Sequence, residues 1–501
     1  MIKNLKKLLF FLSPKERKQF PLLLILIFIM AILDMIGVAS IMPFMTVLTN
    51  PSLVETNIVL KSLLKFSKIF GVETNQQFLF VLGILVFSLL VVSIILKAFT
   101  TYVIVRFAYM REYSISKLLV EGYLHQPYSW FLNRNSSDLG KSILGEVGTI
   151  VGGGIRPMMD LITHGAISVM LLILLIIVDV KIALSVFFIF GMAYLLIYKL
   201  SRTHVNRIGQ ERLESNQLRF ISLAEAFGAV KEVKVSSLEK PYIKRFADPA
   251  KKMAKHHASF HIISQLPRFA LEAIAFGGMM LLVLYMMPQT GTFVKALPII
   301  TLYALAGYRL MPALQKIYNC FSQLRYIRPA LDNLYNDVKN LKPLEKELSV
   351  EVSPLELNKK ISLNNISFNY PNTSRTALKN INLDIPAKNT VAIVGATGSG
   401  KTTTVDIILG LLEPQKGTLE VDGYIIDKQN RKAWQKTIGY VPQNIFLADD
   451  TISANIALGV DREKIDQKAV EHASKIANLH DFVMNELPNQ YHTTTGERGV
   501  R

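Results

Sequence analysis

The chain has 501 residues, of which half are apolar and 19% are charged, so a wholly soluble or disordered protein is disfavoured, because soluble domains carry about 25% charged residues. The net charge of +18 fits either a nucleic-acid surface or the cytoplasmic face of a membrane protein. Cys320 is the only cysteine, which excludes an internal disulfide and a multi-cysteine metal site.

Long apolar stretches recur six times before residue 342. Each contains at most one charged residue and is long enough to cross the ~30 Å hydrocarbon core of a bilayer. The first stretch is too long for a signal peptide, and no small-residue cleavage pattern follows it. We therefore predict an α-helical membrane domain over residues 1–341, with spans at about 21–47, 78–105, 161–178, 182–198, 269–287 and 296–314.

The basic residues lie mostly on one side of these six spans. Residues 1–20, 106–160 and 199–268 hold 26 Lys and Arg, and the segments on the opposite side hold five. The positive-inside rule places the rich segments, and with them both termini, in the cytoplasm. Because these segments account for most of the positive charge, we expect no nucleic-acid partner.

The two large inner loops are about 55 and 70 residues long, so we expect the membrane helices to continue into the cytoplasm. Each loop has a short break in its helical pattern, at residues 126–139 and 225–235. We expect the chain to turn back at these two elbows. Composition alone is typical of ordinary helix–helix turns.

A polar linker at 342–354 leads to a second domain at 355–501. Its start predicts strands at 361–368 and 380–385, and a buried strand at 390–394. The sequence after the third strand is Gly395, Ala396, Thr397, Gly398, Ser399, Gly400, Lys401 and Thr402, followed by a helical pattern from Thr403 to 412. A strand, a Gly-rich loop and a helix in this order predict an α/β phosphate-binding loop.

The residue types of this loop suit a nucleoside triphosphate. Its glycines let backbone N–H groups converge on phosphate oxygens at a helix N-terminus, where the helix dipole also favours anions. Lys401 adds a cation for the β and γ phosphates, and the hydroxyl of Thr402 suits Mg²⁺. Tyr370, in a polar turn before the loop, is a candidate for stacking on a base, although an aromatic residue before a proline is more often a packing residue.

Together these features resemble the half-transporter layout of ABC exporters, in which a six-span domain is fused to an ATP-binding domain. Tyr370 matches the adenine-stacking aromatic of that family, residues 395–402 match its Walker A loop, and Tyr440, Val441, Pro442 and Gln443 match its Q-loop. The resemblance implies ATP and Mg²⁺ as cofactors, Thr403 within the ATP site and Gln443 as a second Mg²⁺ contact. It also implies that the two elbows are coupling helices.

The resemblance covers the whole chain but only the first part of the ATP-binding domain. Thr495 to Arg501 look like the segment before the family's signature motif, and no signature, Walker B strand or switch histidine follows. We therefore expect a C-terminally truncated sequence with no catalytic residue of its own. Such a fragment should not hydrolyse ATP alone.

Within the exporters, short segments at 40–44, 266–268 and 308–312 resemble bacterial flippases of lipid-linked oligosaccharides. The pyrophosphate of such a lipid needs cations in or near the bilayer, for which Lys97, Arg268 and Arg309 are candidates. Lys97 and Arg268 also fit ordinary snorkelling or span-edge positions. Asp34 and Glu272 are alternative partners for these cations.

The resemblance implies an ATPase that exports or flips an amphiphile, in the inner membrane of a bacterium, with a second half-transporter as partner and a homodimer as the expected assembly. An exporter of another lipid, a peptide or a drug is an alternative. A membrane protein that binds ATP without hydrolysing it is an alternative of another class.

Overall fold

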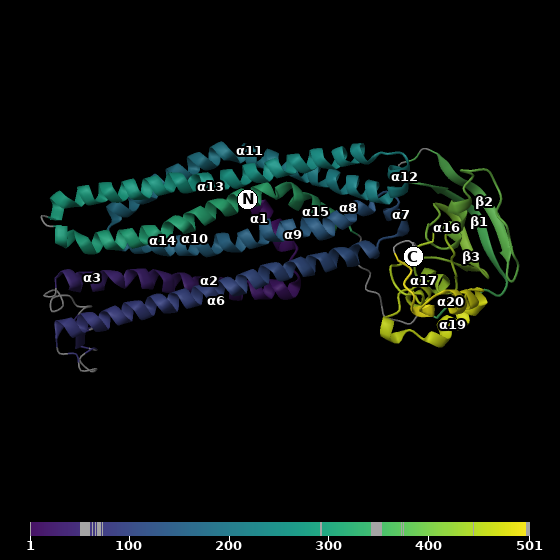
Figure 1. Cartoon of the computed structure of the whole chain (residues 1–501), viewed down its shortest axis with the longest axis horizontal. Helices are drawn as coiled ribbons and strands as arrows, with labels where there is room; N and C mark the ends of the chain where they lie inside the picture. Colours follow the sequence, from purple (N-terminus) through teal and green to yellow (C-terminus); the bar gives the residue numbers. More distant parts are fainter. Residues whose placement is uncertain are drawn as a thin grey trace. The chain divides into compact units, whose positions relative to one another are not determined.

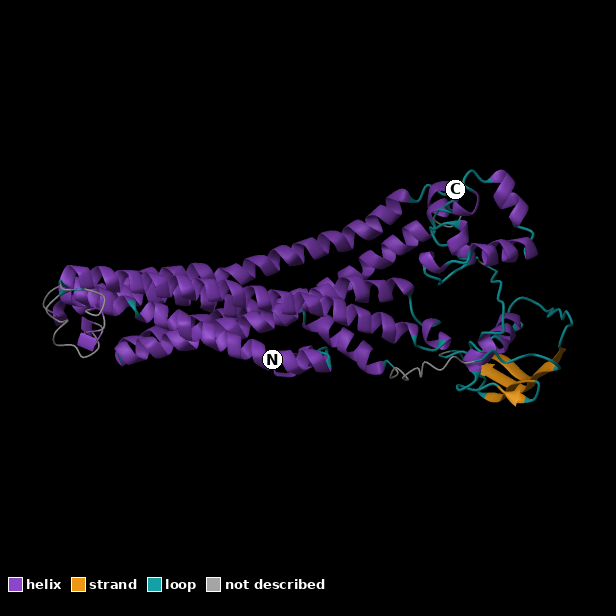
Figure 2. Cartoon of the chain, turned by 90° about the horizontal axis from the view of Figure 1, so that it is seen from below, coloured by secondary structure: helices purple, strands orange, loops and turns teal. Residues whose placement is uncertain are grey.

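The computed structural model describes residues 2–50, 61–62, 64–65, 67, 72, 74–290, 293–341, 353–371, 373, 375–443 and 445–496. The chain divides into two compact units, residues 1–348 and 349–501. The division falls inside the segment predicted as a linker. The described part of the first unit is helical, and the strands belong to the second unit (orange in Figure 2).

The first unit is built from long helices joined by short turns (Figure 1). α6 contains 50 residues and α13 contains 52, so each is about 75 Å long at 1.5 Å per residue. Since a bilayer core is ~30 Å thick, such helices extend well beyond it, as the sequence predicts. The helices are α1 (Ile2–Phe10), α2 (Pro14–Ala39), α3 (Ile41–Thr49), α6 (Asn75–Leu124), α10 (Arg156–Val178), α11 (Val180–Gly228), α13 (Glu239–Thr290), α14 (Phe293–Tyr326) and α15 (Arg328–Asn340).

Short helical pieces occupy both predicted elbows. α7 (Tyr128–Phe131) follows the end of α6, and α12 (Val230–Val235) lies between α11 and α13. The breaks predicted at 126–139 and 225–235 are therefore present. After the first elbow the chain continues through α8 (Ser136–Lys141), the π-helical turn η1 (Ser142–Glu146), α9 (Val147–Ile150) and the π-helical turn η2 (Val151–Ile155).

Three helical stretches of the described chain are long and apolar enough to cross a membrane: Pro14–Thr49, Gln76–Leu124 and Ser136–Val178. They contain the first three predicted spans. Within the first span Ser40 separates α2 from α3, but its backbone stays helical, and its N–H donates to the carbonyl of Ile36 at 2.9 Å. The other three predicted spans lie within α11, α13 and α14, which are helical throughout those residues. A total of six spans therefore stays a prediction.

Apolar side chains from distant parts of the first unit form its core. One cluster joins α1, α6, η2 and the turn between α14 and α15, with Leu8, Ile115, Ile155 and Ile327 buried. The packing is close at Gly209 of α11, where a Cβ atom would lie 2.3 Å from the carbonyl oxygen of Tyr326. Only glycine fits there. α11 and α14 thus approach each other through their backbones.

The second unit contains one antiparallel four-stranded sheet in the order β2-β1-β3-β4. The strands are β1 (Lys360–Asn369), β2 (Thr376–Pro386), β3 (Lys416–Val421) and β4 (Tyr424–Ile425). Its helices are α16 (Lys401–Ile408), α17 (Arg431–Gln435), α18 (Ile452–Ile456), η3 (Arg462–Lys464), α19 (Gln467–Ile476), α20 (His480–Glu486) and η4 (Gln490–His492).

The strand predicted at 390–394 is wrong. Residues 390–396 are exposed and carry no regular structure. An apolar run becomes a strand only when a neighbouring strand supplies its hydrogen-bond partners, and no described strand pairs with this one. The strands predicted at 361–368 and 380–385 are confirmed as β1 and β2.

Candidate functional site

The Gly-rich loop of the second unit turns directly into α16. Gly398 has a φ of 77° and Gly400 a φ of 93°, a backbone region that glycine adopts readily. A Cβ on Gly400 would also lie 2.8 Å from the carbonyl oxygen of Ala377. The loop therefore packs against the start of β2, and the first N–H groups of α16 remain available to an anion.

Lys401, the first residue of α16, folds its side chain back over the loop. Its ammonium group donates hydrogen bonds to the carbonyl oxygens of Gly395, at 2.8 Å, and Ala396, at 2.9 Å. The backbone N–H of Ser399 also donates to Ala396, at 3.1 Å. The cation is thus held at the centre of the loop. This is where it can meet phosphate oxygens bound by the surrounding N–H groups.

Tyr370 lies at the end of β1, beside the start of α16. Its hydroxyl is 3.0 Å from Oγ1 of Thr403, and its ring lies edge-on to Phe368, with 5.1 Å between centroids. Tyr370 is half-buried and Thr403 is buried. The structure therefore places an aromatic ring next to the phosphate loop. Ordinary packing against Phe368 and Thr403 accounts for the same position of the ring.

The structure does not bring all the predicted metal contacts together. Thr402 is exposed in the first turn of α16, and Gln443 is exposed in a segment without regular structure. Among the residues that the structure describes, no hydrogen bond joins their side chains. Thr397 and Ser399 lie in the loop, and the carbonyl of Gly398 accepts a hydrogen bond from Arg375 at 3.4 Å.

The far end of α16 is held by residues that sequence reasoning missed. The indole N–H of Trp434 donates to the carbonyl of Ile408 at 2.7 Å, and the amide of Gln435 donates to Leu409 at 3.1 Å. These bonds satisfy carbonyls that the end of a helix leaves without partners. Burial raises the pKa of Asp406 on the same helix. Trp434, one of two tryptophans in the chain, was the available signal.

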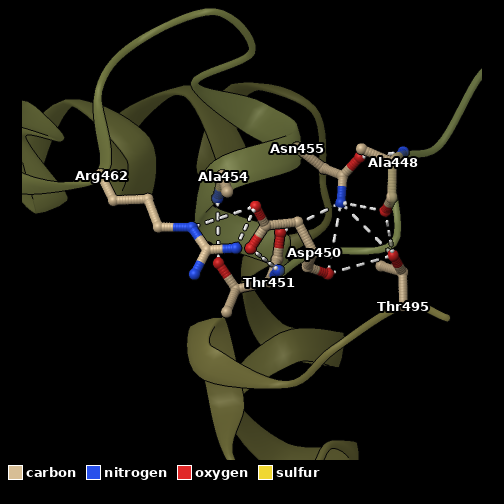
Figure 3. A network of polar contacts seen from close by, with 7 residues as sticks. All are labelled: Ala448, Asp450, Thr451, Ala454, Asn455, Arg462 and Thr495. Carbon is tan, nitrogen blue, oxygen red and sulfur yellow. Dashed lines mark hydrogen bonds and ion pairs between the residues drawn. The ribbon is translucent and has the colours of Figure 1, made fainter. Parts of the chain in front are cut away.

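A second missed feature is a polar network in the segment after Gln443 (Figure 3). The amide of Asn455 donates to the carbonyls of Ala448 at 3.0 Å and Thr451 at 3.1 Å, and its oxygen accepts from the N–H of Ala448 at 2.8 Å. The hydroxyl of Thr495 donates to the same carbonyl of Ala448 at 2.9 Å. Asn455 therefore joins the segment after the predicted Q-loop to the end of the described chain.

An ion pair between Arg462 and Asp450 belongs to the same network (Figure 3). Arg462 lies 2.7 Å from the carboxylate of Asp450. The pKa of Asp450 is lowered by a hydrogen bond from the backbone N–H of Thr451 and by Arg462. The carboxylate is thus ionised at neutral pH.

The first elbow is attached to α15. The carboxylate of Asp337 accepts a hydrogen bond from the hydroxyl of Tyr123 and lies 2.7 Å from the guanidinium of Arg134. The guanidinium lies 4.3 Å from the ring centroid of Trp130 in α7. At the second elbow, Val233 of α12 is buried and its carbonyl accepts from the N–H of Leu238. Both elbows are thus fixed by specific contacts.

Two of the three predicted substrate cations have acidic partners. Arg309 of α14 forms an ion pair with the buried carboxylate of Asp34 in α2, which also accepts a hydrogen bond from Ser93 at 3.2 Å. Arg268 lies 2.7 Å from Glu272. Lys97 is half-buried, and no described carboxylate forms an ion pair with it. Among the three candidates, Lys97 is therefore the one whose charge is left to bind a substrate pyrophosphate, as far as the described residues show.

Comparison with known proteins covers both units. The model of the ABC transporter transmembrane region matches residues 25–305, more than half of the chain. The chain belongs to the ABC transporters. The ABC transporter model for the ATP-binding region matches residues 378–498. One transmembrane region and one ATP-binding region make up the layout of an ABC half-transporter, and the chain is a multi-pass membrane protein.

Curated relatives match over shorter segments. An uncharacterized ABC transporter ATP-binding protein of Bacillus subtilis is 37% identical over 144 residues, which are 29% of this chain and 25% of that protein. A putative multidrug export ATP-binding/permease protein of Staphylococcus aureus is 37% identical over 166 residues, 33% of this chain and 27% of that protein. ATP-binding cassette sub-family B member 5 of mouse is 41% identical over 142 residues, 28% of this chain and 11% of that protein.

The aligned part of this chain thus spans about a quarter or less of these relatives. A solved structure of a bacterial Atm1-family ABC exporter with ATP bound superposes with a TM-score of 0.70 at 18% identity, covering 93% of this chain and 79% of that one. At this identity the likeness shows the exporter fold alone.

Proposed function

We propose that the chain is one half of an ATP-driven exporter that moves an amphiphilic substrate out of the cytoplasm. The observation that carries this proposal is the position of Lys401 at the start of α16, where the carbonyls of Gly395 and Ala396 hold its ammonium group. The same chain contains an ABC-type membrane region. The protein is proposed to be an ATPase.

The proposed ATP site consists of the loop 395–402 with Thr403, Tyr370 and Gln443. The loop N–H groups and Lys401 bind the phosphates, and Tyr370 stacks on adenine. Thr402 and Gln443 hold Mg²⁺, which neutralises phosphate charge when bound. The exposed Gln443 lies in a segment without regular structure, so this role requires it to approach Thr402 when nucleotide binds.

We propose residues 1–341 as the membrane domain with six spans, 342–354 as the linker and 355–501 as the ATP-binding region. α7 and α12 act as coupling helices. The distribution of basic residues supports both termini in the cytoplasm, and the bacterial relatives support a bacterial plasma membrane. The half-transporter layout supports a second half-transporter as partner, in a homodimer.

The substrate class that we propose is an amphiphile, with a lipid-linked oligosaccharide as the narrower candidate. The narrower candidate rests on the short sequence resemblances, because Arg309 and Arg268 already have acidic partners. Lys97 is the cation that supports it. Export of another lipid, a peptide or a drug is consistent with the same site.

The test is a Lys401→Ala change in the full-length protein, reconstituted in vesicles. ATP-dependent transport should be abolished, because removing this cation leaves the phosphate charge uncompensated. Thr404→Ala, on the same helix but bonded to the carbonyl of Gly400, is the control for folding of α16. Unchanged transport in the Lys401 variant would overturn the ATP site. Wild-type protein that binds ATP but releases no phosphate would favour the non-hydrolysing alternative.

A further inference from the structure

One exposed face runs along α6 and changes its chemistry partway. Its first part is apolar, with exposed residues at spacings of three or four: Phe80, Ile84, Phe87, Val91 and Ile95. Residues at these spacings share one side of a helix. The same side then continues with Tyr102, Arg106, Tyr109 and Tyr113, all exposed. An apolar stripe followed by tyrosine and arginine is typical of a helix that leaves the hydrocarbon core for the headgroup layer.

Two guanidinium groups lie on this boundary. Arg106 donates a hydrogen bond to the hydroxyl of Tyr102 at 3.3 Å. Arg156, at the start of α10, donates to the hydroxyl of Tyr109 at 3.3 Å, and its Cζ lies 5.9 Å from the centroid of the Tyr109 ring. The contact of Tyr109 with Arg156 therefore connects α6 with α10.

Neither guanidinium is neutralised by an acidic side chain in the described part of the chain. Over the described residues, no carboxylate forms an ion pair with Arg106 or Arg156. The acidic residues near these arginines in the sequence contact other groups. Asp160 lies 3.2 Å from Lys316, and the carboxylate of Glu112 lies beside Gly148 of α9. Two positive charges, each beside a tyrosine hydroxyl, are thus left for an external anion.

The depth of these residues identifies the source of that anion. The second predicted span ends at residue 105 and the third begins at 161. With 1.5 Å per residue, Arg106 lies about 1.5 Å and Arg156 about 7.5 Å beyond the ends of the predicted spans. The headgroup layer occupies roughly 5–7 Å on each side of a bilayer. Because arginine side chains are long, both guanidinium groups can therefore reach the level of the lipid phosphates.

We propose that Arg106 and Arg156 form a binding site for the phosphate of an anionic phospholipid in the cytoplasmic leaflet. Its acyl chains lie on the apolar stripe of α6, and Tyr102 and Tyr109 orient the two guanidinium groups. This inference goes beyond the proposed export function and does not depend on the ATP site. It assigns a structural lipid to the junction of α6 and α10.

The stripe favours a lipid over a second copy of the chain as occupant. Its apolar residues run to Ile95, and tyrosine and arginine follow from Tyr102, close to the end of the predicted span at 105, as lipid contact requires. Charge complementarity also favours an anionic lipid, because the two arginines have no acidic partner in the described chain.

The test is native mass spectrometry of the full-length protein in detergent, with phosphatidylglycerol or phosphatidylcholine added. We expect preferential retention of phosphatidylglycerol by the wild type. Arg106→Gln with Arg156→Gln should weaken that retention about fivefold for each arginine. Arg106→Lys with Arg156→Lys keeps the charges and should retain most of the binding, which separates loss of charge from misfolding.

Lys117→Gln is the matched control. Lys117 continues the same side of α6, but lies about 18 Å beyond the predicted hydrocarbon core and pairs with Glu121. It should leave lipid retention unchanged. Equal retention of both lipids, or unchanged retention in the double Gln variant, would overturn the proposal. Displacement by millimolar inorganic phosphate would assign the site to a free anion, and loss of dimer in the double Gln variant without loss of lipid would assign the face to a second copy.

Discussion

The hydroxyl of Tyr370 at the end of β1 lies 3.0 Å from Oγ1 of Thr403 in α16. This bond fixes the ring beside the phosphate loop, and Phe368 supports it from the edge. The ring can therefore serve as a preformed surface for a base. A residue that only packs against Phe368 and Thr403 would have the same position. A role in stacking on adenine and a packing role therefore differ only in whether the ring binds a base.

Tyr370→Ala should weaken ATP binding, because stacking of a base on an aromatic ring contributes about 1–3 kcal/mol. This corresponds to a rise in Kd of roughly fivefold to 150-fold. Tyr370→Phe keeps the ring and should change Kd little. Titration of the full-length protein with a fluorescent ATP analogue measures both values. Equal Kd values for wild type and Tyr370→Ala would leave Tyr370 as a packing residue.

The ion pair of Asp34 with Arg309 should stabilise the membrane unit. The carboxylate of Asp34 is 1% exposed, and breaking a buried pair by removing one partner costs about 3–5 kcal/mol. We expect Arg309→Ala to lower the free energy of unfolding by an amount of this order. Asp34→Ala combined with Arg309→Ala should recover most of the loss, because no unpaired charge remains.

Equilibrium unfolding in detergent, analysed as a double-mutant cycle, gives the coupling between the two residues. Ser93→Ala is the comparison, since it removes a hydrogen bond to the Asp34 carboxylate but no charge, and it should cost about 1.5–3 kcal/mol. Additive single and double variants would show that the pair contributes nothing. Loss of transport with unaltered stability in Arg309→Ala would instead favour a direct role in the substrate path.

Features set by consecutive residues were predictable. The turn of the phosphate loop into α16 follows from Gly398, Gly400 and Lys401, and the two elbows follow from breaks in helical patterning. The strand at 390–394 was not predictable in the same way. An apolar run has the composition of a buried strand whether or not another strand pairs with it, so composition alone does not show that residues 390–394 form one.

Contacts between distant residues escaped the sequence for another reason. Asp34 and Arg309 are 275 positions apart, and Asn455 and Thr495 are 40 apart. Which side of a helix faces which neighbour depends on packing of the whole unit. The sequence identified Asp34 as one alternative partner for the intramembrane cations. It did not show which of these cations faces Asp34, so the pairing with Arg309 was not predictable.

Asp337 should matter more for coupling than for stability. It joins α15 to the first elbow through Tyr123 and Arg134, and α15 is the last helix before the segment that leads to the ATP-binding region. Burial and the hydrogen bond to Asp337 raise the pKa of Tyr123, so this hydroxyl stays a donor at neutral pH. Asp337→Asn should reduce the stimulation of ATP hydrolysis by transported substrate.

The stability cost of Asp337→Asn should be small, about 0.2–1 kcal/mol, since Arg134 is partly exposed. Asp332→Asn is the matched control, because Asp332 lies on the same helix but pairs with Lys7 of α1, at 2.7 Å. ATPase rates with and without substrate, in vesicles, distinguish the two variants. Equal effects of both changes would mean that α15 responds as a whole and that the Asp337 contact carries no specific coupling.

Asp422 should make the stability of the second unit depend on pH. It forms the β3–β4 turn with Gly423, where both residues have positive φ, as a two-residue hairpin turn of this type requires. Its carboxylate accepts hydrogen bonds from the backbone N–H groups of Asn358, Lys359 and Lys360, at 2.6, 2.8 and 2.8 Å. These bonds lower its pKa, the one from Asn358 most.

A carboxylate whose pKa is lower in the folded state stabilises that state above its unfolded pKa of about 3.9, and this stabilisation is lost as the pH falls towards the folded value. Asp422→Asn should therefore unfold at a lower temperature than wild type at pH 7, and the difference should shrink below about pH 4. Asp461→Asn, which removes only an exposed pair with Lys464, should melt like wild type throughout. A difference for Asp422→Asn that is the same at pH 3 and pH 7 would contradict the role of the charge and assign the effect to turn geometry, because the geometry does not titrate.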